Sequence, residues 1–173
     1  MKFPAHTGTH VDAPGHLIHE AYEQGRGVES LSLDVLNGPA LIVEVPPGHN
    51  ITAKVLQNLQ IPPSTKRLLL KTDNTAKGLM TKTAFDTSYT GVTTDGAQWL
   101  VDNTNISLIG NDYLTIAVYD DLMGPHEVLM GQGVMIVEGL DFRAIEPGLY
   151  MLHCLPLKLV GSDGAPVRCI AEV

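Results

Sequence analysis

Residues 6–16 read His-Thr-Gly-Thr-His-Val-Asp-Ala-Pro-Gly-His, and this stretch decides how the chain is interpreted. Its glycines, threonines and proline disfavour a helix, so an extended segment is expected. Alternate residues of an extended chain point to one face, which puts positions 6, 8, 10 and 12 together. His6, His10 and Asp12 on that face can bind a metal, and Gly8 leaves room for a ligand or another backbone.

The donor atoms of this segment suit a divalent transition ion such as zinc or manganese, because they are imidazole nitrogens and a carboxylate oxygen. The alternative is a histidine-rich surface loop or part of an expression tag. Tags do not interleave aspartate, glycine and proline in this way, and a random loop has no reason to keep the even spacing. The segment therefore predicts a metal site.

Composition favours one soluble globular domain spanning residues 1–173, with 44% hydrophobic and 17% charged residues. The net charge of −8 argues against nucleic acid and anionic membranes as partners. No apolar run approaches the roughly 18–20 residues that span a bilayer. The first residues contain no apolar core of a signal peptide, although a secreted form stays open if such a segment has been lost.

The pattern of turns and apolar runs predicts an α/β fold with a mixed sheet or barrel and short flanking helices. Helices are expected at 51–59, with Thr52 as N-cap, and at 96–102 and 125–130. The last two strands should form a hairpin through residues 161–165. Strands are expected at 40–45, 67–72, 106–109, 114–118, 134–137, 149–160 and 166–173.

The two cysteines, Cys154 and Cys169, cannot form a disulfide framework or a thiolate zinc site. Buried free thiols are the default interpretation. One bridge between them stays open because both fall in what look like neighbouring strands.

The stretch at 6–16 resembles the signature of the metal-dependent cyclase family, which includes bacterial kynurenine formamidases (arylformamidases), isatin hydrolases and plant cyclase-like proteins. The resemblance is greatest to the plant branch and continues at 37–40, 96–102, 119–122, 155–158 and 164–168. It implies a swivelling β/β/α fold and a homodimer or larger oligomer. The exposed edges of many short strands also favour oligomers. Family members usually carry some tens of residues before the signature, so this chain is expected to lack the family's N-terminal segment.

The resemblance implies one or two divalent ions per chain, zinc first and manganese as the alternative. His6, His10 and Asp12 would bind the first ion, and Asp12 would bridge to a second one completed by His126 and Glu138. Glu138 follows the apolar run 134–137, where an unpaired carboxylate would be costly. The alternatives are a surface histidine at a helix start for His126 and a salt-bridged carboxylate for Glu138.

The same resemblance makes His16 the general acid/base, a role that suits an imidazole with an unperturbed pKa near 6.5. A simple helix cap is the alternative for His16. We expect His19 to have a supporting or surface role, His49 to be solvated and His153 to be packed and hydrogen-bonded.

The implied reaction is metal-assisted hydrolysis of a C–N amide bond, as in the conversion of N-formylkynurenine to kynurenine and formate in tryptophan catabolism. No Gly-x-Ser-x-Gly string offers a competing serine nucleophile. A ring-opening lactam hydrolase or cyclase, and a catalytically silent metal-binding stress-related protein, are the alternatives. Candidates to cover an aromatic substrate are Phe85, Tyr89, Trp99 and Tyr119.

Overall fold

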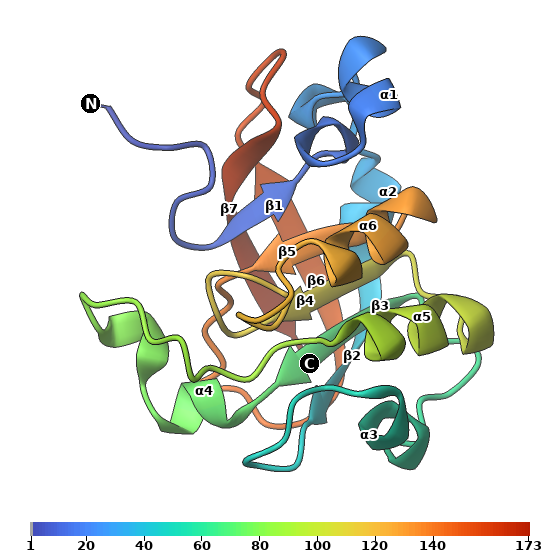
Figure 1. Ribbon diagram of the computed structural model, residues 1–173, viewed down its shortest axis with the longest axis vertical. Coiled ribbons are helices and arrows are strands. Elements are labelled where there is room, and N and C mark those ends of the chain that lie inside the picture. The colour runs from blue at the N-terminus through green and yellow to red at the C-terminus, as the bar shows by residue number, and fades with distance from the viewer. Residues whose placement is uncertain (1) are drawn as a thin grey trace.

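A computed structural model describes residues 2–173 and shows a closed barrel of mixed strands (Figure 1). Strands β2 to β5 pair in parallel, whereas β1, β6 and β7 close the barrel through antiparallel pairs. The predicted α/β domain with a mixed barrel is thereby confirmed. In barrel order the strands are β1 (His10–Asp12), β5 (Met135–Glu138), β4 (Leu108–Asn111), β3 (Arg67–Lys71), β2 (Asn37–Glu44), β6 (Gly148–Pro156) and β7 (Gly164–Glu172).

The barrel has apolar layers inside and outside its parallel strands. Leu69 of β3 packs in the inner cluster, while Leu68 and Leu70 pack in the outer cluster. Burial on both faces explains why this strand is continuously apolar rather than alternating. A partly open and mostly apolar cavity of about 160 Å³ lies beside Ile42, Leu69 and Val167.

The outer cluster is built by three helices, α3 (Ala53–Asn58), α5 (Thr94–Asn103) and α6 (Gly124–Gly131), all close to their predicted bounds. Thr52 caps α3 as predicted, because its Oγ1 accepts from the Val55 amide at 3.3 Å. Three shorter helices were not predicted, since segments of one or two turns show little periodicity: α1 (His19–Glu23), α2 (Leu33–Leu36) and α4 (Asp73–Ala76). Among residues 2–173, no helix combines the length and apolarity that a membrane crossing requires.

The strand predicted at 114–118 is wrong. This segment is a loop that keeps only an isolated bridge between Val92 and Ala117. Its polar backbone is used elsewhere: the Ile116 amide donates to Glu138, and the Thr115 carbonyl accepts from Asn111. The preceding strand, β4, ends at Asn111, and the loop that follows contacts Glu138 at the end of β5.

The strand predicted at 149–160 ends early, at Pro156, and the chain then turns towards the N-terminal segment. The hairpin of β6 and β7 is confirmed. Cys154 and Cys169 are register partners in this hairpin and form a disulfide, so the free-thiol interpretation is wrong and the open alternative holds. The expected exposed sheet edges are also wrong, because the barrel closes.

Candidate metal centre

Strand β1 brings the histidine-rich segment between β5 and β7, with His10 opposite Glu138 in the register. His10 Nε2 lies 3.0 Å from Glu138 Oε2. The extended form predicted for 6–12 holds only from His10 onwards, because Gly8 adopts a left-handed φ of 62°. The bend nevertheless returns His6 to the site, where its Nδ1 lies 2.9 Å from Asp12 Oδ1.

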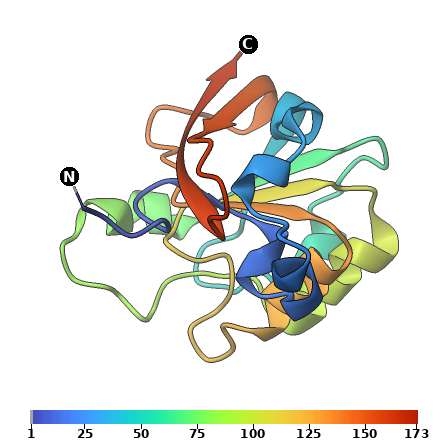
Figure 2. The same ribbon diagram turned by 90° about the horizontal axis from the view of Figure 1, so that it is seen from above.

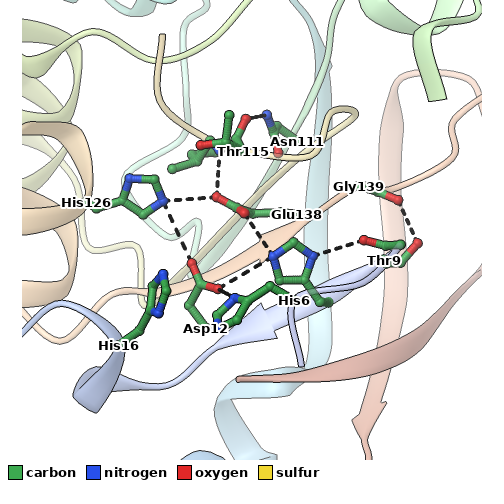
Figure 3. A network of polar contacts seen from close by, with 12 residues as sticks. His6, Thr9, Asp12, His16, Asn111, Thr115, His126, Glu138 and Gly139 are labelled. Carbon is green, nitrogen blue, oxygen red and sulfur yellow. Dashed lines mark hydrogen bonds and ion pairs between the residues drawn. The ribbon is translucent and has the colours of Figure 1, made fainter. Parts of the chain in front are cut away.

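The second half of the site comes from α6 and the end of β5. The Nδ1 of His126 lies 2.7 Å from the Leu122 carbonyl oxygen, which turns Nε2 towards the site. That Nε2 is 3.0 Å from Glu138 Oε1 and 3.8 Å from Asp12 Oδ2. His126 is 6% exposed, so its interpretation as a surface histidine is wrong. Figure 3 shows these side chains converging from β1, α6 and β5.

The five side chains predicted as ligands therefore meet in one cluster: His6, His10, Asp12, His126 and Glu138. Two trios share Asp12, namely His6–Asp12–His16 and His10–Asp12–Glu138. Within each trio the possible ligand atoms lie within 4.8 Å of one another.

The environment of the Asp12 carboxylate shows whether the cluster fits a cation. Its side chain is 1% exposed, and neither carboxylate oxygen accepts a hydrogen bond within residues 2–173. The His6 nitrogen approaches one oxygen closely, but not in hydrogen-bond geometry. A buried carboxylate without donors is costly unless a cation satisfies it. The nitrogen and oxygen donors around it fit a divalent transition ion.

The carboxylates of the cluster favour positive charge on the imidazoles around them. Contact with Asp12 raises the pKa of His6. Burial lowers the pKa of His10 and His126, but Glu138 outweighs burial and raises both. Burial likewise raises the pKa of Glu138, while the two histidines lower it more strongly. Bound cations would compete with protons for the same imidazole nitrogens.

His16 lies at the solvent side of the cluster, in the short 3-10 turn Pro14–His16. Its ring centroid is 4.1 Å from that of His6, and its side chain is 29% exposed. Together with His19 and Tyr22 it lines an open hollow of about 380 Å³. The sequence missed Asp163, whose Oδ2 lies 2.9 Å from His16 Nδ1. Its Gly-Ser-Asp-Gly context signals only a turn.

The remaining histidines lie as predicted. The His19 side chain is 84% exposed and pairs with Glu23, His49 is exposed, and His153 is partly buried on β6. Hydrogen bonding of His153, also predicted, stays a prediction.

Three of the four predicted aromatic residues gather near the end of β5. Phe85 packs against Tyr89 and Tyr119, with ring centroids 5.7 and 6.2 Å apart. Tyr113, which the sequence did not single out, completes this cluster, and its carbonyl accepts from the Gly139 amide next to Glu138. Trp99 packs instead in the helical layer outside the barrel.

The amino-acid sequence is similar to those of known proteins from plants and bacteria. The chain is 55% identical over 171 residues to cyclase-like protein 2 of Arabidopsis thaliana. It is 34% identical over 175 residues to the kynurenine formamidase of Salinibacter ruber. These matches cover 98% of this chain and 63% and 77% of the respective relatives. The chain thus spans 63% of the length of this plant relative.

Solved structures agree with this relationship. A potential metal-dependent hydrolase with cyclase activity superposes with a TM-score of 0.83 at 32% identity, covering 98% of this chain and 80% of that one. An isatin hydrolase with bound thioisatinate shares the fold at a TM-score of 0.79 and 20% identity, covering 99% of this chain and 73% of its own. The sequence profile of the family described as "Putative cyclase" matches residues 1–118. The chain therefore belongs to the cyclase family.

Proposed function

We propose that this protein is a metal-dependent amidohydrolase that holds two divalent ions, zinc or manganese, across the shared Asp12. His6 and His10 would complete the ligands of one ion, and His126 and Glu138 would complete those of the other. The observation that carries the proposal is the buried Asp12 carboxylate, which has no hydrogen-bond donor although imidazoles surround it. The potential metal-dependent hydrolase that shares the fold at 32% identity supports it.

Bound divalent ions would act as Lewis acids and lower the pKa of an attacking water. His16 is placed for the proton that the departing nitrogen needs, because it lies between the buried carboxylates and the open hollow. A substrate entering through that hollow would meet His16 before the buried groups. This division assigns His16 a role in proton transfer and leaves the half-buried His6 and the four buried groups as ligands.

The substrate class that we propose is a small aryl formamide, with N-formylkynurenine as the first candidate. Similarity to kynurenine formamidases supports this choice. The neighbouring rings of Phe85 and Tyr119, which are 49% and 50% exposed, also support it, because they offer a surface on which an aromatic substrate can stack.

The test is hydrolysis of N-formylkynurenine by protein loaded with zinc or with manganese. Chelated protein serves as the control, and Glu127→Gln, an exposed carboxylate next to His126, is the matched variant. The proposal expects formate and kynurenine from the loaded parent and from Glu127→Gln, and none from chelated protein. Hydrolysis of a cyclic amide but not of N-formylkynurenine would show that cyclic amides, and not aryl formamides, are the substrate class. Metal binding without hydrolysis of either amide would contradict the enzymatic proposal and favour a silent metal-binding protein.

We also propose that two copies of the chain associate through the outer face of β6 and β7. Four alternate apolar residues on this face are 41–75% exposed: Leu149, Met151, Leu155 and Ile170. Arg168 and Glu172 flank Ile170 on β7. A two-fold axis across the strand at Ile170 would place Arg168 of each copy opposite Glu172 of the other.

Light scattering at micromolar concentration tests this contact. We expect a mass of about twice 18.6 kDa for the parent, and dissociation when Ile170 is changed to Glu. Reversing the charge at either Arg168 or Glu172 alone should lower the measured mass. Reversing both charges together should restore the mass of the dimer. A monomeric parent would contradict the proposal.

A further inference from the structure

The loop between β6 and β7 carries a second carboxylate to the edge of the metal centre. Asp163 Oδ2 lies 2.9 Å from His16 Nδ1 and 3.3 Å from His6 Nε2. One carboxylate oxygen thus forms a hydrogen bond with His16 and lies within ion-pair distance of His6. Figure 2 shows the start of β7 beside the N-terminal segment, as the pairing of β1 with β7 requires.

The backbone of this loop is fixed to the same segment that its side chain contacts. The Asp163 carbonyl accepts from the Ala13 amide at 2.9 Å, directly after Asp12. The Ser162 carbonyl accepts from the Val28 amide at 2.8 Å, and the Ser162 hydroxyl donates to the Gly164 carbonyl at 2.7 Å. The position of the Asp163 carboxylate relative to the two histidines is therefore held from both sides of the loop.

We propose that Asp163 is a positioning residue that orients His16 through the hydrogen bond at Nδ1 and faces Nε2 of His6 as an ion-pair partner 3.3 Å away. An acceptor at Nδ1 of His16 fixes the tautomer in which Nε2 keeps a free lone pair. With the Asp163 carboxylate beside Nε2 of His6, Nδ1 of that ring faces Asp12 and is the nitrogen available to a metal. An outer carboxylate that orients a ligating histidine is a common arrangement. The catalytic part of this inference rests on the proposed function, whereas the tautomer and the metal affinity do not.

Nitrogen NMR of the zinc-loaded protein, labelled in its histidines, reads the tautomers directly. Long-range proton–nitrogen spectra at mildly alkaline pH should show His16 protonated at Nδ1 in the parent, with the signal assigned by its loss in His16→Gln. In Asp163→Asn and in Asp163→Ala this preference should disappear. The matched control is Asp141→Asn, an exposed aspartate that pairs with Arg143 outside the metal centre. The control should keep the parent spectrum.

Zinc affinity, measured by competition with a chelating dye, gives the second readout. Loss of the outer carboxylate on His6 should weaken zinc binding by about 10–100-fold in both Asp163 variants, and leave Asp141→Asn unchanged. With N-formylkynurenine, the same variants at saturating zinc should lower kcat more than they change KM.

The outcomes separate the two proposals. Parent-like His16 tautomers and zinc affinity in either Asp163 variant would overturn the positioning role, whatever the activity. Equal losses in Asp141→Asn would overturn it too, since the effect would then not be specific to the loop. A parent that fails to hydrolyse any amide, with the tautomer and affinity changes as expected, would leave Asp163 in its role and overturn only the hydrolase.

Discussion

His10 and Glu138 are register partners on adjacent strands, and their side chains meet at 3.0 Å. His10 lies in the middle of the conspicuous histidine-rich stretch, and Glu138 ends an apolar strand far along the chain. The antiparallel pairing of β1 with β5 closes the barrel and also brings these two side chains of the centre together.

Changing His10 to Ala should remove zinc binding and also destabilise the metal-free protein. His10 neutralises Glu138 in the buried cluster, and breaking a buried pair costs about 3–5 kcal/mol. Zinc titration and urea unfolding check the two effects, with the exposed His49→Ala as control. Full zinc binding by His10→Ala would remove His10 from the ligands.

Changing His16 to Ala should leave the metals in place and lower kcat on the order of 10²–10⁴, the range for loss of a general acid or base. Metal analysis and steady-state kinetics on the same sample separate binding from chemistry. His16 also belongs to a trio with His6 and Asp12. Loss of metal in this variant would therefore make it a ligand.

Changing Gly164 to Ala should weaken zinc binding through His6. An added Cβ would lie 2.5 Å from His6 Cε1 and 3.0 Å from the Val11 carbonyl oxygen, so the imidazole must move. We expect a stability loss of about 1–3 kcal/mol from overpacking. Gly131→Ala is the control because no atom lies within 4 Å of its added Cβ. Parent-like zinc affinity in Gly164→Ala would contradict the placement of His6.

Changing Asp112 to Asn should destabilise the fold without touching the metal centre. The buried carboxylate accepts from the backbone and hydroxyl groups of Thr72 and Thr75, at 2.6–3.1 Å. Hydrogen bonds to a charged acceptor contribute about 1.5–3 kcal/mol each, and an amide cannot accept them all. Thermal unfolding should show a lower Tm than in the exposed control Asp120→Asn. An equal Tm would show that this network contributes little.

The five residues predicted as ligands lie together in the structure, although local patterns in the sequence do not connect them all. Spacing alone indicated His6, His10 and Asp12, whereas His126 and Glu138 came only from the family. The parallel strands were predictable because burial on both faces leaves continuous apolar runs. The apolar run 114–118 carries the same local signal, but its Ile116 amide donates to Glu138 and its strand-like pairing is limited to the isolated bridge with Val92.

Asp163 shows what the sequence could not reveal. It is 147 residues from His16, and its local context is that of any hairpin turn. Only the docking of the β6–β7 loop on the N-terminal segment makes it a neighbour of the site. Free thiols were favoured for Cys154 and Cys169 for a related reason, because pairing depends on a register that the sequence does not contain.

The count of zinc ions bound per chain, measured by equilibrium dialysis and metal analysis, tests the central claim most directly. The buried Asp12 carboxylate is shared by both proposed ions, so the parent should bind two, and Asp12→Asn should lose both. Zinc should raise the Tm of the parent only, since binding at 100 times Kd adds about 2.7 kcal/mol of stability. A parent that binds no zinc, or an Asp12→Asn variant that binds as many ions as the parent, would contradict the account.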